Sequence, residues 1–402
     1  MLDLFTGSGV GPTILFLSFA CFVGFWLGKV KVAKVSLGIT WVLFVGIILS
    51  ACGVNLNHDM LNVIKEFGLI LFVTAVGIQV GPNFFASFKK GGLLLNILAT
   101  CNVALAVLVV VLISKSTGES LVNMAGVYTG AITNTPGMSA AQQTVSELGI
   151  VTPDTIANGY AVAYPLGVVG LILSCLILKR VCRVDLAKEP TTDDKNTVQN
   201  EPVETSDHKP RKIDILTPIF IMIFLGVILG SVPIPLGMSA PVKLGLAGGP
   251  LVMAILVSWF GVKKGLFRLR FTTSKRITII REMGISLFLA AVGLSSGGSF
   301  VSTIQAGGYI WILYGVIITM VPTLIIGLVA RLVFHVNFYT LMGMIGGGTT
   351  DPPTLAFANT LAAEYVDEGD ENQLPNMGYA TVYPLTMFLR ILTAQLLVLF
   401  AV

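Results

Sequence analysis

The sequence predicts an all-α polytopic membrane protein made of two inverted-topology repeats, each with about five transmembrane helices plus a re-entrant hairpin. Composition, an internal duplication and the placement of basic residues predict this fold. Of the 402 residues, 54% are hydrophobic and 11% are charged, against roughly 25% charged in soluble domains. Apolar runs such as residues 12–28, 93–113 and 309–330 approach or exceed the length that spans a bilayer core.

The second observation is that the two halves of the chain repeat each other. The segment from Lys65, KEFGLILFVTAVGIQVG, matches the segment from Arg281, REMGISLFLAAVGLSSG, at a constant offset. Further on, GAITNTP at residues 130–136 matches GGTTDPP at residues 347–353, and GYAVAYPL at residues 159–166 matches GYATVYPL at residues 378–385. Internal repeats of this size in a membrane protein indicate a transporter.

Counting the apolar segments predicts how the two copies lie in the membrane. Crossings are expected near residues 12–28, 36–52, 66–82, 93–113 and 158–179, and again near residues 214–230, 244–260, 279–296, 309–331 and 378–400. The segment between the fourth and fifth crossings, about residues 121–149, is too short for two further spans and should form a re-entrant hairpin. An odd number of crossings per copy requires the second copy to enter the membrane upside down.

Basic residues predict the orientation. No Lys or Arg precedes the first apolar run and three follow it, so we expect a retained helix with its N-terminus outside. The domains are then a first repeat in residues 1–182, a disordered cytoplasmic linker in residues 183–213, and a second, inverted repeat in residues 214–402 with its C-terminus outside. This orientation puts most Lys and Arg residues of both halves in the cytoplasm, while Lys65, Lys115 and Lys243 lie outside.

Helix-breaking residues at the tip of each hairpin predict a substrate site. A Pro flanked by Gly, Thr and Asn interrupts a helix, and the restarting helix is expected to present uncapped N–H groups to a carboxylate near the midplane. The candidate binding residues are Thr133, Asn134, Thr135, Pro136, Gly137, Thr349, Thr350, Asp351, Pro352 and Pro353. The alternative is a pair of ordinary tight turns at the surface.

Two further positions in the third spans are candidates for the same cavity. The stretches VGIQVGPNF at residues 76–84 and VGLSSGGSF at residues 292–300 are interpreted as helix breaks, with Gln79 and Ser295 facing the cavity. The alternative is that the glycines serve close helix packing.

Asp351 and Arg390 are ionisable residues at membrane depth, where charge is costly. Arg390 is expected to face the cavity, where it either pairs with Asp351 or receives a substrate carboxylate; a purely structural ion pair is the alternative. Asp351 could instead bind a substrate ammonium, a sodium ion or a proton. The five scattered cysteines and three loop or terminal histidines assemble no metal site, and we expect no cofactor and no enzymatic activity.

The duplicated motifs GAITNTPGMSAA and GGGTTDPPTLAF, each followed by GYA and YPL, resemble those of the aspartate–alanine exchanger family of bacterial transporters. The resemblance implies a multi-pass protein of the bacterial inner membrane that exchanges amino acids or small carboxylates. Many members carry a large soluble region between the halves, where this chain has a short linker. The expected partners are a small anionic or zwitterionic substrate, membrane lipid and a second copy in a homodimer, but no nucleic acid.

Two other functions remain open at this point. The glycine-rich hairpin is similar to those of sodium-coupled carboxylate symporters, so a sodium- or proton-coupled symporter is the main alternative to an antiporter. An anion channel would not be expected to contain an upside-down duplicate. The favoured mechanism is alternating access, in which each hairpin and its neighbouring broken span move past a static part that also forms the dimer, by elevator or rocking motion.

Overall fold

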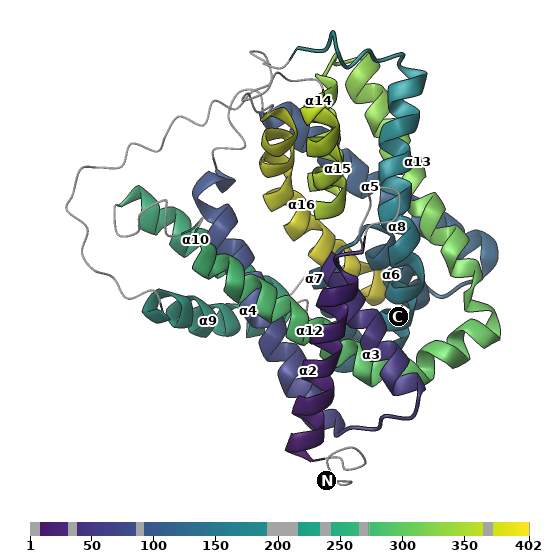
Figure 1. The fold of residues 1–402 in the computed structure, drawn as a ribbon, viewed down its shortest axis with the longest axis vertical. Coiled ribbons are helices and arrows are strands. Elements are labelled where there is room, and N and C mark those ends of the chain that lie inside the picture. Colours follow the sequence, from purple (N-terminus) through teal and green to yellow (C-terminus); the bar gives the residue numbers. More distant parts are fainter. Residues whose placement is uncertain are drawn as a thin grey trace.

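The structure is a computed structural model that describes residues 9–30, 38–85, 92–190, 216–233, 243–264, 272, 274–364 and 373–401. Within these residues the chain is helical and contains no strand (Figure 1). The helices of the first half are α2 (Val10–Leu27), η1 (Gly38–Thr40), α3 (Trp41–Ala51), α4 (His58–Phe84), α5 (Gly92–Thr117), α6 (Leu121–Ala131), α7 (Thr135–Leu148) and α8 (Asp154–Val181).

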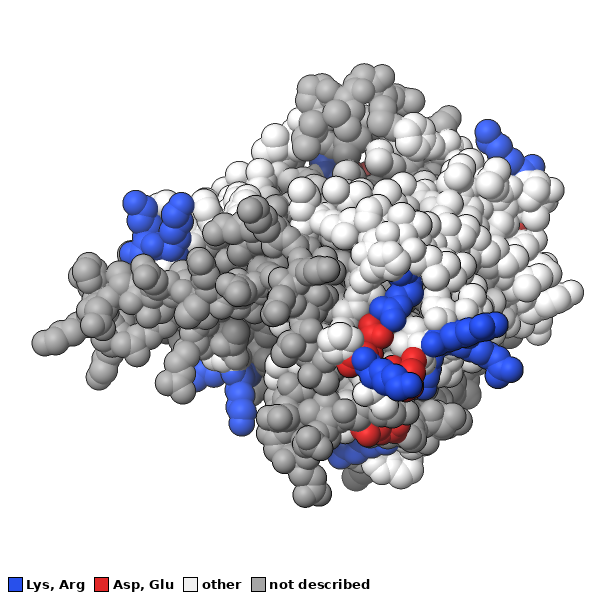
Figure 2. All heavy atoms as spheres, turned by 90° about the horizontal axis from the view of Figure 1, so that it is seen from above, with Lys and Arg blue, Asp and Glu red and all other residues white. Residues whose placement is uncertain are grey.

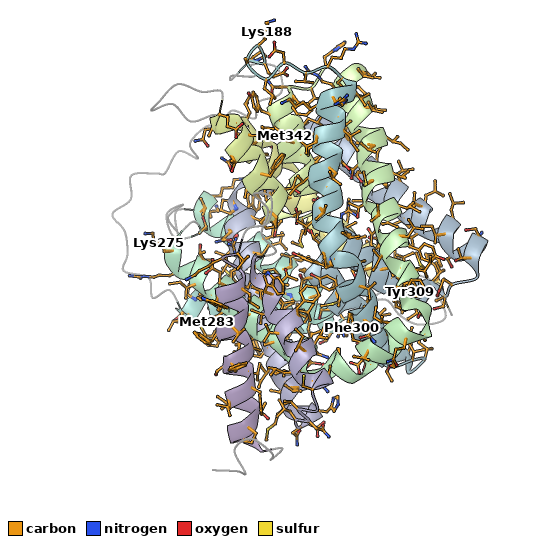
Figure 3. All side chains as sticks on the ribbon, turned by 45° about the vertical axis from the view of Figure 1, so that its right-hand side comes forward. Lys188, Lys275, Met283, Phe300, Tyr309 and Met342 are labelled. Atoms are coloured by element: carbon orange, nitrogen blue, oxygen red, sulfur yellow. The ribbon has the colours of Figure 1, made fainter. Side chains whose placement is uncertain are left out.

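The second half repeats this order of long and short helices. Its members are α9 (Leu216–Ser231), α10 (Gly245–Lys263), α12 (Lys275–Thr303), η3 (Ile304–Gly308), α13 (Ile310–Leu332), α14 (Phe338–Gly348), α15 (Pro352–Ala363) and α16 (Leu374–Leu399). Figure 3 marks the course of α12 with Lys275, Met283 and Phe300. Every expected crossing coincides with a helix, and both expected hairpins are pairs of short helices, α6–α7 and α14–α15.

The described helices make this a multi-pass membrane protein. Eight of them are long and apolar enough to cross a bilayer, and two shorter apolar helices, Gly38–Ala51 and Leu216–Ser231, correspond to the remaining expected crossings. Their large apolar side chains, such as those of Phe22, Trp26 and Phe224, are exposed on the outside of the bundle. In a bilayer this surface contacts lipid, so its exposure carries no cost.

The helices form two groups that pack mainly within themselves. The crossed group comprises α2, α3, α4, α9, α10 and α12, and the hairpin group comprises α5 to α8 and α13 to α16 (Figure 1). Packing pairs recur when the halves are exchanged: α4 packs on α10 as α12 packs on α3, and α6 packs on α8 as α14 packs on α16. These contacts place α4 and α12 in one group with α3 and α10. The sequence analysis had instead expected α4 and α12 to move together with the hairpins.

The expected breaks in the third spans are not present. Helices α4 and α12 run continuously through residues 76–84 and 292–300. A Cβ atom on Gly77 would lie 2.7 Å from the Leu251 carbonyl oxygen of α10, and one on Gly293 would lie 3.0 Å from Gly46 of α3. The glycines therefore serve close helix packing, which is the alternative that the sequence left open.

The start of the predicted linker is ordered. Val184 and Leu186 are buried, and Glu189 forms a two-pronged ion pair with Arg331, with N–O distances of 2.7 and 2.8 Å. The Glu189 carboxylate also accepts from the Phe338 N–H at 2.8 Å, so it fixes the first turn of α14. Figure 2, which views the molecule of Figure 1 from above, shows basic and acidic side chains close together on that face. Residues 191–213, the rest of the predicted linker, lie outside the described residues.

Candidate functional site

Both hairpin tips use the same backbone turn. After α6, the Asn134 N–H donates to the Thr129 carbonyl at 2.8 Å, and after α14 the Asp351 N–H donates to the Gly346 carbonyl at 2.7 Å. The preceding residues, Thr133 and Thr350, are left-handed, with φ of 56° and 58°. That conformation costs roughly 1–2 kcal/mol for a residue other than glycine. Each tip therefore holds a strained threonine at the turn.

Asn134 and Asp351 begin the second helix of each hairpin as N-caps. Asn134 Oδ1 accepts from the Gly137 N–H at 2.6 Å, and Asp351 Oδ2 accepts from the Thr354 N–H at 2.8 Å. The first two positions of α15 are prolines, which have no N–H. The expectation of uncapped N–H groups is therefore wrong for α15, and in α7 only the Thr135 N–H is left for a solute.

The two tips contact each other inside the protein. Thr133 Oγ1 donates to the Thr349 carbonyl at 3.1 Å, and Asn134 Nδ2 donates to Thr350 Oγ1 at 3.0 Å. All four residues are buried, as is Asp351. The alternative of two surface turns is excluded by this burial, because the tips meet in the interior rather than in bulk water.

A cavity of about 580 Å³ lies against the joined tips. Its volume is within the range of small-molecule sites. Six of the residues proposed from the sequence line it: Thr133, Thr135, Pro136, Thr350, Pro352 and Gln79. Asn134, Gly137, Thr349, Asp351 and Pro353 belong to the same tips but are not among the lining residues.

Ser295 and Arg390 do not line this cavity. The Ser295 hydroxyl donates to the Val292 carbonyl of its own helix at 2.9 Å. Arg390 is fully buried, and its Nε donates to the carbonyl of Gly348, the last residue of α14, at 2.8 Å. Its Nη1 donates to Tyr128 Oη at 3.3 Å. In this structure Arg390 therefore supports the carboxyl end of α14, where the helix dipole is negative.

Asp351 and Arg390 do not form an ion pair, although both are described. Asp351 Oδ1 and Arg390 Nη2 are each buried without a hydrogen-bond partner. Buried polar atoms are normally satisfied, and exceptions often mark functional sites. Asp351 directly follows Thr350 in the sequence, and Thr350 lines the cavity.

Several cavity residues were missed by the sequence reasoning. Arg281 and Glu282 are the charged residues among the lining residues, and the sequence analysis had used Arg281 only for the repeat alignment and the orientation. Tyr379 and Tyr383 also line the cavity, with ring centroids 5.1 Å apart. The signal for the tyrosines was the repeated GYA and YPL motif, because residues four apart share a helix face.

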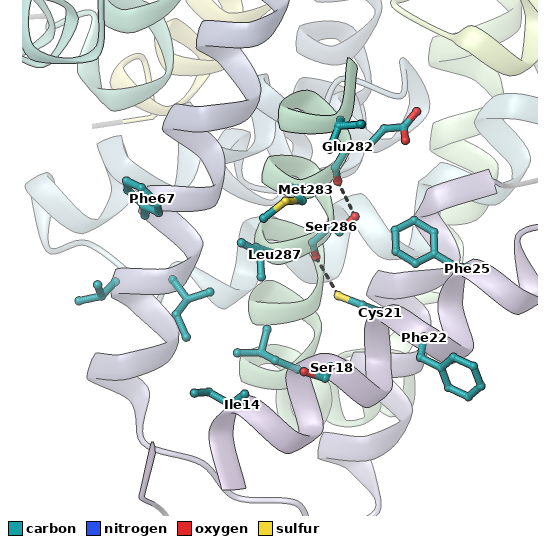
Figure 4. A pocket seen from close by; sticks show the side chains of 14 residues that line it. Ile14, Ser18, Cys21, Phe22, Phe25, Phe67, Glu282, Met283, Ser286 and Leu287 are labelled. Carbon is teal, nitrogen blue, oxygen red and sulfur yellow. Dashed lines mark hydrogen bonds between the residues drawn. The ribbon is translucent and has the colours of Figure 1, made fainter. Parts of the chain in front are cut away.

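A second cavity, of about 690 Å³, lies beside the first between α2, α4 and α12 (Figure 4). Its lining is mostly apolar, and Cys21 Sγ contacts the Ser286 carbonyl across it at 3.8 Å. Phe25 and Glu282 line both cavities. These two residues therefore form the wall between an apolar groove and the cavity at the tips.

Comparison with known proteins agrees with this architecture. Residues 16–180 and 218–399 match the profile of the aspartate–alanine exchanger family, described as a predicted permease membrane region. An uncharacterized transporter of Bacteroides fragilis is 36% identical over 98% of this chain and 97% of its own length, and one of Bacteroides thetaiotaomicron is 33% identical over 98% of each chain. The first alignment spans 554 positions against 402 residues here, so the relative is longer. The chain therefore belongs to the aspartate–alanine exchanger family of membrane permeases.

Proposed function

We propose that this protein exchanges amino acids or small carboxylates across the bacterial inner membrane by alternating access, with the substrate bound at the joined hairpin tips. The observation that carries the proposal is the contact of the two tips beside a cavity, through the 3.0 Å bond between Asn134 and Thr350. Binding at the meeting point of two duplicated hairpins would let one site be exposed to either side in turn.

The recurring contacts support an inverted repeat. Helix α4 packs on α12, its counterpart in the other half, and α5 packs on its counterpart α13. A two-fold axis that exchanges the halves must therefore pass between the two helices of each pair. The paired glycines Gly68 and Gly284 lie at such a crossing, where a Cβ on Gly68 would be 2.8 Å from the Gly284 carbonyl oxygen. Because each copy has five crossings, this axis would lie in the membrane plane.

The position of the cavity supports an inward-facing state. Its lining includes Phe25, Gln79 and Arg281, which lie near the ends of α2, α4 and α12 that this topology assigns to the cytoplasm. On the outer side, α8 is tied to α12 because Asn158 Nδ2 donates to Thr303 Oγ1 at 3.0 Å. Transport would then open this contact while closing α16 onto α4, as the hairpin group moves against the crossed group.

The side chains around the tips suit a small carboxylate or a zwitterion. The hydroxyl groups of Thr133, Thr135 and Thr350 and the Gln79 amide offer hydrogen bonds. The family relationship supports exchange as the transport mode, and the relatives' names support transport without specifying a substrate.

A coupled symporter is the second candidate, and Asp351 favours it. Its Oδ1 atom is fully buried without a partner, as expected for a site that takes up a sodium ion, a proton or a substrate ammonium. Exchange requires no such ion, so the two candidates differ in their coupling requirement.

Counterflow in proteoliposomes tests both candidates. Vesicles with purified protein are loaded with unlabelled L-aspartate or L-alanine, and uptake of labelled L-aspartate is measured with and without a sodium or proton gradient. Exchange predicts uptake that depends on internal substrate and not on the gradients. Uptake into empty vesicles driven by a gradient would support symport, and currents far above carrier turnover would indicate a channel.

A further inference from the structure

Arg281 is a cation in the cavity wall, beside Glu282, and a neutral side chain orients it. Its Nη1 donates to Gln79 Oε1 at 2.9 Å, and Gln79 Nε2 donates to Thr278 Oγ1 at 3.3 Å. Among the described residues no carboxylate lies within ion-pair distance of Arg281. A guanidinium has five N–H donors, so most of them are left for a solute carboxylate.

The duplication pairs Arg281 with a second cation, Lys65. The sequence KEFG begins at Lys65 and REMG begins at Arg281, so each cation precedes a Glu and lies three residues before one of the crossing glycines, Gly68 and Gly284. Lys65 Nζ is also oriented by a neutral partner, Asn62 Oδ1, at 3.1 Å. In the proposed topology Lys65 belongs to the outer side and Arg281 to the inner side.

The two cations each have a Glu as sequence neighbour, and they differ in the residue that the start of α8 or α16 supplies. Among the described residues Lys65, like Arg281, forms no ion pair; the carboxylates that act on its charge are the adjacent Glu66 and then Asp154 of α8, whose Oδ1 accepts from Ser296 Oγ of α12 at 3.5 Å. The repeat places neutral Gln373 at the position equivalent to Asp154. On the closed outer side the electrostatic surroundings of the cation therefore include a carboxylate from α8, whereas on the open inner side the equivalent residue, at the start of α16, is neutral.

We propose that Arg281 binds the carboxylate of the substrate in the inward-facing state, and that Lys65 does so in the outward-facing state. This rests on the proposed exchange function. In each state the cation beside the open cavity is available to the substrate. On the closed outer side, the negative charge of Asp154 opposes the positive charge of Lys65. A carboxylate thus finds a positive charge beside the tips from either side of the membrane.

Side-specific kinetics test the proposal. Oriented proteoliposomes carrying wild type, Arg281→Gln, Arg281→Lys or Lys65→Gln are assayed by L-aspartate counterflow, with substrate varied on one face at a time. Arg281→Gln should raise the half-saturating concentration at the cytoplasmic face about tenfold or more and leave the outer face nearly unchanged. Lys65→Gln should do the reverse, and Arg281→Lys should be intermediate.

The matched control is Arg276→Gln, an exposed basic residue on the same helix that does not line the cavity. It should behave as wild type, and thermal unfolding of each variant checks folding. Wild-type half-saturation in folded Arg281→Gln would overturn the role of Arg281. Equal effects of Lys65→Gln on both faces, or on neither, would overturn the pairing. Wild-type vesicles that exchange no carboxylate would instead overturn the proposed function and this inference together.

Discussion

The Asn134 amide reaches across the two halves of the protein to the Thr350 hydroxyl, 3.0 Å away, while its oxygen caps its own helix. At the equivalent position of the second half Asp351 keeps the capping contact. The first hairpin therefore shows that an amide, at Asn134, can cap the helix as the Asp351 carboxylate does in the second hairpin. Any property that requires the charge of Asp351 can be separated from its role as a cap.

Replacing Asp351 with Asn should preserve stability and reduce transport. The amide oxygen can accept from the Thr354 N–H as Asn134 Oδ1 accepts from Gly137, so the unfolding free energy should change by less than about 1 kcal/mol. Transport should fall tenfold or more if the free carboxylate oxygen binds a cation, a proton or an ammonium. Thermal unfolding and counterflow measure the two effects. Wild-type transport by this variant would show that Asp351 is only a cap.

Glycine at position 350 should be more stable than alanine. Both replacements remove the hydroxyl that accepts from Asn134, but only glycine relieves the left-handed backbone at φ of 58°. We expect the glycine variant to be more stable by about 1 kcal/mol in chemical or thermal unfolding. The control is Thr349, whose φ of −104° is allowed for any residue, so glycine should give no advantage there. Equal stability of the two position-350 variants would argue against strain at the tip.

Arg390→Leu should destabilise the second hairpin. Its repeat counterpart is Leu171, but there the carbonyl equivalent to that of Gly348, on Ala131, accepts from Thr319 Oγ1 at 2.7 Å. Leucine at position 390 would leave the Gly348 carbonyl without its Arg390 Nε donor, at a cost of about 1–3 kcal/mol. Thermal unfolding measures the loss, with Arg276→Leu as an exposed control. A stable Arg390→Lys variant with tenfold weaker substrate binding would instead indicate that the guanidinium contacts substrate.

Alanine at Gly284 should disrupt the crossing of α4 and α12. Its Cβ would lie 2.5 Å from the Phe72 amide nitrogen and 2.7 Å from the Gly68 carbonyl oxygen, and backbone atoms cannot move aside as side chains can. A loss of about 1–3 kcal/mol is expected. A Cβ on Gly298, on the same helix, would meet no described atom within 4 Å, so alanine there should be neutral or stabilising. Similar unfolding temperatures for the two variants would contradict tight packing at this crossing.

The elements of the fold were predictable because their signals are local. Apolar length alone gives the crossings, and each expected one coincides with a helix. The hairpins followed from segments too short to cross twice, and the matching of Thr133 to Thr350 followed from the duplication. Continuity of α4 and α12 was harder to foresee, because glycines that break a helix and glycines that allow helices to approach look alike in sequence.

The sequence by itself therefore determined the membrane class, the duplicated order of helices and the residues of the two tips. The tertiary structure decided which charged groups line the cavity. Arg390 donates a hydrogen bond to the end of α14 instead, and Arg281 lines the cavity wall. Both are arginines in helices that cross the membrane, and neighbouring residues do not distinguish them. The direction of a side chain depends on which distant helices pack around it, and that information lies in contacts between segments hundreds of residues apart.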